Sequence, residues 1–236
     1  MRHYYRRYIV IGISVVLISL IFLATDEPFK SFNYYFEVLY NYVNFAAIYL
    51  TIFLIGLPSI ASKLFATKSV IRYADKFQLT WSMHKRLFMY SLYYSSIISI
   101  VNLLVVLLFC PQVYLNTVEY YVFILIAFLV QVVGWYFIGG IYLLLYTCCK
   151  NTVITYFFTV LLFSITIIFS RVEALSSIKY YFSVYDLMYT FFYVGNASKI
   201  IVYVTYFSML SAGALWLMYS VLKRTDLIYR AKGERE

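Results

Sequence analysis

The chain has 236 residues, of which 64% are hydrophobic and only 12% are charged. Its mean hydropathy of +0.82 is too high for a soluble domain, which must keep a hydrated surface. Only helices or closed barrels satisfy their backbone hydrogen bonds in hydrocarbon, and these apolar runs last about 20 residues without the alternation of barrel strands. We therefore predict an all-α, polytopic membrane protein with a single transmembrane domain over 1–236.

Six apolar runs predict six transmembrane helices, at about 8–25, 38–60, 87–110, 120–148, 152–170 and 199–222. The first run follows Arg2, Arg6 and Arg7, and we interpret it as a signal anchor rather than a cleaved signal peptide. The fourth run is long enough to tilt or to continue beyond the membrane. Pro58 is expected to mark the inner end of the second span.

The distribution of Lys and Arg predicts that both termini are cytoplasmic. With this orientation, only Lys30, Arg171, Lys179 and Lys199 among the 19 basic residues lie outside, as the positive-inside rule requires. The net charge of +9 then reflects topology in a bacterial cytoplasmic membrane, and no nucleic-acid partner is expected. The three cysteines are an odd number divided between the two sides, which argues against a disulfide framework.

A long basic stretch, 62–86, joins the second and third predicted spans on the cytoplasmic side. As a helix it would place Val70, Phe77 and Trp81 on one face and leave Arg72 and Lys76 free to meet water or a partner. This stretch is the best candidate for docking another protein. The alternative is a basic helix that lies against lipid headgroups.

A second long connection, 171–198, is predicted outside the membrane, before the sixth span. Its apolar residues recur at helical spacing and predict one continuous stripe, formed by Leu175, Ile178, Phe182, Tyr185, Tyr189 and Phe192. The segment is therefore expected to be amphipathic and either to lie in the outer interface or to fold back as a re-entrant hairpin. A cap over a pathway and an inert interfacial helix fit this pattern equally well.

The sequence lacks the residues that most membrane enzymes need. The two histidines, His3 and His84, fall in the amino-terminal tail and the cytoplasmic loop, and the predicted spans carry almost no ionisable groups. We expect no catalytic residue, no metal site and no cofactor in this chain, which disfavours an intramembrane enzyme. There is also no G-x-x-x-x-G-K-[ST] motif, so any ATP and Mg²⁺ would be bound by a partner subunit.

The polar groups inside the predicted spans are uncharged. The third span carries Ser91, Ser95, Ser99 and Asn102 at spacings of three and four, the fourth carries Gln131, and the sixth carries Ser208. Small polar residues at this spacing mediate helix packing, although they could instead line a transport surface. The absence of charge argues against a proton or sodium relay and suits an amphipathic or hydrophobic cargo.

This layout resembles the permease subunits of type-2 ABC exporters, in particular small bacterial exporters of peptides and bacteriocins. The segment Ile71-Arg72-Tyr73-Ala74-Asp75-Lys76, continuing through Trp81-Ser82-Met83-His84-Lys85-Arg86-Leu87, is similar to the coupling loop of that family. The resemblance implies that Arg72, Asp75, Lys76, Phe77 and Trp81 contact a nucleotide-binding subunit. It also implies an external re-entrant pair before the sixth span.

The function we expect is therefore that of a membrane permease subunit that pairs with an ABC ATPase and with a second permease copy or paralogue. The chain would not be catalytic itself and would release an amphipathic peptide or other hydrophobic cargo outward. The alternative is a membrane immunity or scaffold protein that does not transport. The identity of the cargo and the choice between homodimer and heterodimer do not follow from the sequence.

Overall fold

The computed structural model describes residues 41–62, 75–109, 118–175, 178–189 and 197–224, and every element in these ranges is helical. The main helices are α3 (Tyr42–Asn44), η1 (Phe45–Tyr49), α4 (Leu50–Gly56), α5 (Pro58–Ala61), α7 (Lys76–Phe109), α9 (Val118–Cys149), α10 (Thr152–Ser170) and α13 (Ala197–Arg224). Three short helices, η3 (Glu173–Leu175), α11 (Lys179–Phe182) and α12 (Val184–Tyr189), lie between α10 and α13. The predicted all-α class is confirmed.

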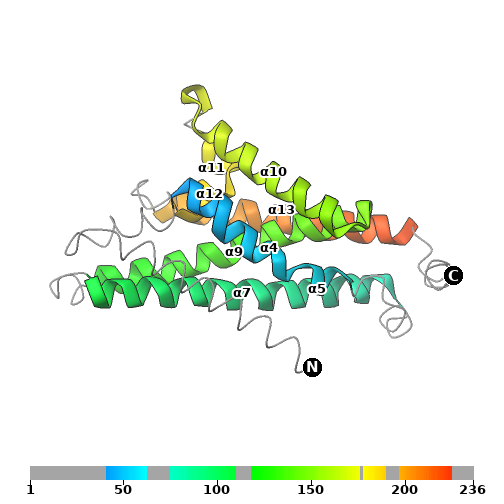
Figure 1. Cartoon of the computed structure of the whole chain (residues 1–236), viewed down its shortest axis with the longest axis horizontal. Helices are drawn as coiled ribbons and strands as arrows, with labels where there is room; N and C mark the ends of the chain where they lie inside the picture. The colour runs from blue at the N-terminus through cyan, green and yellow to red at the C-terminus, as the bar shows by residue number, and fades with distance from the viewer. Residues whose placement is uncertain (1–40, 63–74, 110–117, 176–177, 190–196, 225–236) are drawn as a thin grey trace.

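Four described segments are long and apolar enough to cross a membrane, namely Tyr42–Ala61, Tyr121–Cys149, Thr152–Ser170 and Ile200–Arg224. They correspond to the second, fourth, fifth and sixth predicted spans. The third predicted span lies within α7, and the first, 8–25, lies outside the described residues. In Figure 1, α7 and α9 run side by side along the long axis with α13 beside them, whereas α10 diverges from this group toward η3.

α7 begins well before the third predicted span. The helix starts at Lys76 and continues without a break to Phe109, so the second half of the 62–86 stretch is the first part of a long helix and not a separate short one. Residues 63–74 lie outside the described part of the chain. At about 1.5 Å per residue, the residues before Leu87 add roughly 16 Å to the helix, which carries it past the predicted membrane boundary.

The second predicted span is a helix with one π-helical turn, η1. Its start is capped by Asn41, whose side-chain oxygen accepts a hydrogen bond from the Asn44 N–H at 2.9 Å. On α7, the hydroxyl of Tyr94 donates to the carbonyl of Tyr49, the last residue of that turn, at 2.8 Å. Single π-helical turns perturb the regular backbone ladder, and here a buried tyrosine supplies a hydrogen bond at that point.

Pro58 lies near the end of this segment, where α4 ends at Gly56 and the four-residue helix α5 begins, and it changes the hydrogen bonds around it. Because proline has no N–H, the carbonyl of Leu54 accepts instead from the N–H of Leu57, at 3.2 Å. The ordinary α-helical partner of Leu57 would have been the carbonyl of Phe53. That carbonyl accepts instead from the hydroxyl of Tyr90 on α7, at 2.9 Å. A side chain from another helix therefore replaces the missing backbone hydrogen bond.

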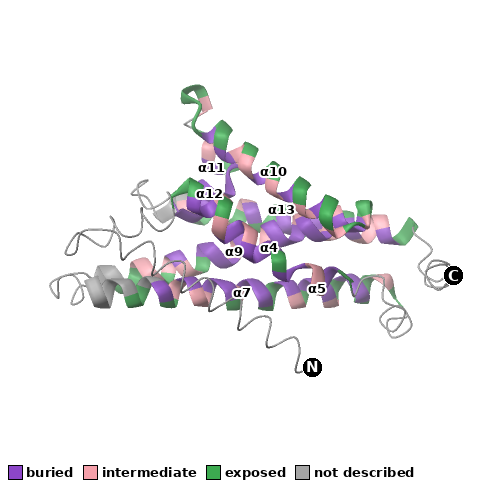
Figure 2. Cartoon of the chain, in the orientation of Figure 1, coloured by how far each residue is buried: buried purple, intermediate pink, exposed green. Residues whose placement is uncertain are grey.

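An aromatic cluster around Trp135, near the middle of α9, forms the centre of the core. The indole is fully buried, and its ring centroid lies 5.5 Å from that of Phe45, 4.8 Å from Phe53 and 4.9 Å from Tyr94. Aromatic pairs at these distances add to the free energy gained by burial alone. The cluster therefore joins the second predicted span, α7 and α9 into one packed unit, and Figure 2 shows buried (purple) stretches along the ribbons of these helices.

α10 follows α9 after a two-residue turn and has a narrow buried face. Lys150 adopts a positive φ of 57°, and the side-chain oxygen of Asn151 caps α10 by accepting from the N–H groups of Val153 and Ile154. The buried residues of α10 repeat every three or four positions, at Thr155, Thr159, Phe163, Ile167 and Ser170. Its other faces are apolar and exposed (Figure 2), as expected for a helix that meets lipid.

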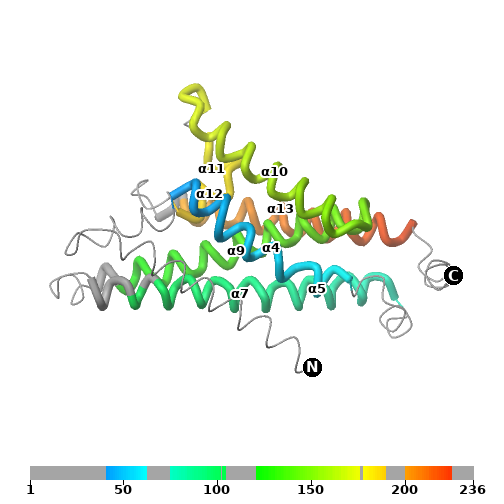
Figure 3. Tube along the Cα trace, in the orientation of Figure 1, coloured from blue at the N-terminus to red at the C-terminus, as the bar shows by residue number. Residues whose placement is uncertain are grey.

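The predicted continuous stripe from Leu175 to Phe192 is wrong where the structure describes it. Ser183 is extended (φ −98°, ψ 105°) and separates α11 from α12. Figure 3 shows the chain turning back beyond α10 through these short helices. Every residue of α12 is buried, and a Cβ added at Gly134 of α9 would lie 2.3 Å from Sδ of Met188. Because Gly134 has no side chain, α12 can pack closely against the middle of α9.

A buried carboxylate lies between two basic side chains in this returning segment. Asp186 of α12 is fully buried, with Oδ1 3.9 Å from Nη2 of Arg171 and 3.8 Å from Nζ of Lys179. The guanidinium of Arg171 also lies over the rings of Tyr42 and Tyr185, at 5.3 and 5.6 Å. These two cations offset part of the cost of burying the carboxylate.

Candidate functional site between α7, α9 and α13

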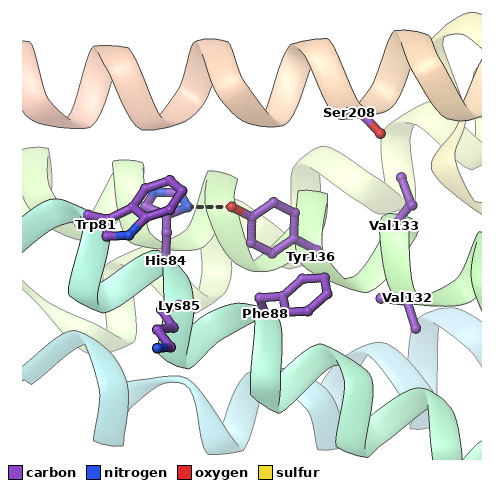
Figure 4. A pocket seen from close by; sticks show the side chains of 8 residues that line it. All are labelled: Trp81, His84, Lys85, Phe88, Val132, Val133, Tyr136 and Ser208. Carbon is purple, nitrogen blue, oxygen red and sulfur yellow. Dashed lines mark hydrogen bonds between the residues drawn. The ribbon is translucent and has the colours of Figure 1, made fainter.

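A pocket of about 490 Å³ opens between α7, α9 and α13. On α7 it is lined by Trp81, Lys85 and Phe88, which are spaced four and three residues apart and therefore share a face, together with the neighbouring His84. The opposite walls are formed by Val132, Val133 and Tyr136 of α9 and Ser208 of α13. Figure 4 shows these side chains and the three helices that carry them.

His84 joins α7 to α9 at the back of this pocket. Its side chain is nearly fully buried, and Nδ1 lies 3.0 Å from the hydroxyl of Tyr136, the contact drawn as a dashed line in Figure 4. Nε2 has no hydrogen-bond partner among the described residues. His84 precedes the apolar stretch that begins at Leu87, and burial lowers the pKa of its imidazole from 6.5 to about 4. The ring is therefore neutral at physiological pH.

The rim of the pocket combines one cation with exposed aromatic rings. Trp81 is 59% exposed and Phe88 is 46% exposed, although the ring of Phe88 also meets that of Tyr136 edge-on at 5.9 Å. Lys85 is exposed and has no acidic partner among the described residues. Such a rim can hold a ligand that is apolar along its length and negatively charged at one end.

Of the six polar residues singled out within the spans, only Ser208 lines the pocket. Its hydroxyl already donates to the carbonyl of Val204 at 2.7 Å. Ser91, Ser95 and Gln131 are fully buried in the protein core instead, and Ser99 is partly buried; Asn102 lies in α7, but its side chain is outside the described residues. The structure therefore does not bring these residues together on one surface.

The residues expected to contact an ATPase are divided between three environments. Arg72 lies outside the described residues, and Asp75 caps α7 by accepting from the N–H of Phe77 at 3.0 Å. Nζ of Lys76 donates to the carbonyl of Lys223 at 3.1 Å. The Phe77 ring meets that of Tyr219 edge-on at 5.7 Å, so the start of α7 is attached to the end of α13. Trp81 belongs to the pocket.

Sequence reasoning did not identify His84, Phe88 or Tyr136 as a site. The spacing of Trp81, Lys85 and Phe88 was a usable signal, because residues at i, i+4 and i+7 share one helical face. The predicted boundary at 87 places Trp81 and Lys85 in the loop 62–86 and Phe88 in the third span, so this shared face is not apparent from the predicted segments. No signal in the sequence pairs His84 with Tyr136, which lies 52 residues later.

Comparison with models of known protein families, with known proteins and with solved structures finds no match.

Proposed function

We propose that the chain is the membrane permease subunit of an ATP-driven ABC exporter in a bacterial cytoplasmic membrane. It has six spans and two cytoplasmic ends, pairs with a second permease and with ATPase subunits that bind ATP and Mg²⁺, and is not catalytic itself. Its cargo is an amphipathic peptide or another hydrophobic molecule, which it moves outward.

The observation that carries this proposal is the attachment of the start of α7 to the end of α13. Lys76 and Phe77 of α7 contact Lys223 and Tyr219 of α13 by a hydrogen bond and an aromatic contact. A force applied to 63–74 by a docked ATPase would act directly on α7. Through these contacts it would also act on α13, and both helices form walls of the pocket. This is the mechanical link that a coupling loop needs.

The arrangement of charges supports the orientation. The start of α7, the end of α9 and the end of α13 lie toward the same end of the molecule in Figure 1. Six described basic residues lie in the first part of α7 and at the ends of α9 and α13, namely Lys76, Lys85, Arg86, Lys150, Lys223 and Arg224, against three between the end of α10 and the start of α13, namely Arg171, Lys179 and Lys199. A bias of basic residues toward one end of a helical bundle is typical of a cytoplasmic face.

The test is co-purification of the tagged chain with the ATPase subunits of its own cell. We expect an ATPase in equal amount with the wild-type chain and with a Lys150→Ala control, and its loss in Arg72→Ala. The pair Lys76→Ala and Phe77→Ala should retain the ATPase but lose ATP-driven release of cargo, because these residues transmit motion to α13.

Recovery of the chain without an ATPase would contradict the proposal and favour the immunity or scaffold alternative. That alternative predicts full activity when residues 63–74 are replaced by a neutral linker of equal length. The replacement must end before Lys76, because the following residues belong to α7 and their removal would disrupt the core.

A further inference from the structure

We propose that the pocket between α7, α9 and α13 binds an anionic phospholipid of the inner leaflet. The phosphate would contact Lys85 at the rim, and the acyl chain would lie along Phe88, Val132 and Val133. This site belongs to the chain alone and does not depend on an ATPase, so it goes beyond the proposed transport function; only its assignment to the inner leaflet rests on the orientation proposed above.

The position of Lys85 agrees with the level of lipid headgroups. It lies two residues before Leu87, where the apolar stretch of α7 begins, and its long side chain can reach toward water while its stem lies against apolar surface. The exposed indole of Trp81 is one turn farther from the membrane on the same face. Trp and Lys at the end of an apolar stretch are characteristic of the membrane interface.

The polar groups of the pocket favour a lipid over a peptide. An extended peptide needs partners for its backbone N–H and C=O groups, and leaving them unpaired in an apolar pocket is costly. The hydroxyl of Ser208 already donates to Val204, and that of Tyr136 is engaged with His84. An acyl chain makes no such demand, and its surface matches the valine and phenylalanine side chains.

A second polar group lies beside the pocket. Nε2 of His84 has no partner among the described residues, and the side chain, only 2% exposed, is one of those that line the pocket. A neutral imidazole can donate from one nitrogen while the other accepts. With Nδ1 accepting from the hydroxyl of Tyr136, Nε2–H is the remaining donor, and a lipid oxygen would reach this buried atom only after the side chains around it move.

The test uses quenching of the fluorescence of a tryptophan at position 88, beside the proposed acyl chain, by lipids with brominated acyl chains. The chain has three tryptophans; Trp135 is fully buried, whereas Trp81 and Trp216 are 59% and 64% exposed. In a Trp81→Phe, Trp216→Phe and Phe88→Trp background, reconstituted in phosphatidylcholine vesicles, quenching reports occupancy beside position 88. Brominated phosphatidylglycerol is compared with brominated phosphatidylcholine at equal mole fractions.

We expect brominated phosphatidylglycerol to reach half-maximal quenching at an about threefold to fivefold lower mole fraction, the upper part of the range for one exposed ion pair. Lys85→Gln should abolish this preference and Lys85→Arg should retain it. A Lys150→Gln control, which changes the same charge in the α9–α10 turn, should also retain it.

Three results would overturn the proposal. Equal quenching by the two lipids would show that only non-selective boundary lipid surrounds position 88, and an unchanged preference in Lys85→Gln would show that Lys85 does not hold the headgroup. Relief of quenching by soluble glycerol phosphate at the concentration of the brominated lipid would show that the site binds a free phosphate and gains nothing from an acyl chain.

Discussion

Removal of one hydroxyl group, in Tyr90→Phe, should reveal how the chain accommodates Pro58. The substitution keeps the ring, which stacks on Phe53 with centroids 5.0 Å apart, and removes the hydroxyl that donates the 2.9 Å hydrogen bond to the carbonyl of Phe53. Leaving a buried carbonyl without a partner costs about 1–3 kcal/mol. We therefore expect the free energy of unfolding to fall by about 2 kcal/mol.

The cost should depend on Pro58. In a Pro58→Ala background the N–H of residue 58 can donate to the carbonyl of Leu54. The N–H of Leu57 can then donate to the carbonyl of Phe53. Tyr90→Phe should then cost less than about 0.5 kcal/mol, which gives a coupling free energy above about 1 kcal/mol between the two positions.

The assay is reversible unfolding in mixed micelles of a mild detergent and sodium dodecyl sulfate, followed by circular dichroism. Tyr94→Phe is the matched control, because its hydroxyl bonds the carbonyl of Tyr49, away from Pro58. Its cost should be the same in both backgrounds. Equal costs of Tyr90→Phe with and without Pro58 would refute the reasoning.

Three further predictions concern packing, pH and topology. Gly139→Ala should destabilise the chain by about 1–3 kcal/mol, since the new Cβ would lie 2.3 Å from Cδ1 of Leu87, whereas Gly140→Ala, with nothing within 4 Å, should be neutral or stabilising by up to about 1 kcal/mol in the same unfolding assay. Above pH 6.5, His84 is neutral in both the folded and the unfolded state, so its burial does not make the free energy of unfolding depend on pH. As the pH falls from 6.5 toward 4 the unfolded state binds the proton first, so stability should drop by about 2 kcal/mol at pH 5, and the drop should be absent in His84→Gln. Cys148 and Cys149 are free and exposed, so a membrane-impermeant maleimide should label them in inverted vesicles and not in intact cells; the opposite pattern would contradict a cytoplasmic end of α9.

The candidate site could be predicted only in part. Trp81 and Ser208 were named from the sequence, but for different roles, because local spacing cannot show that α7 and α13 face the same space. The hydrogen bond between His84 and Tyr136 joins residues on different helices, so its existence depends on how α7 and α9 are aligned. The pocket is a property of three helices together.

The sequence by itself determined the helical class and the approximate helix positions, because backbone groups in a bilayer must pair within their own segment and apolar length sets each span. The predicted span 152–170 has the same bounds as α10, Thr152–Ser170, whereas the other helices begin or end at residues different from those predicted. Only the tertiary structure decided that α7 begins at Lys76, that the helix is interrupted at Ser183, and that α12 is buried against Gly134. The physical reason is that these features depend on contacts between residues far apart in the chain, which outweigh local apolar periodicity where a side chain from another helix completes the packing or the hydrogen bond.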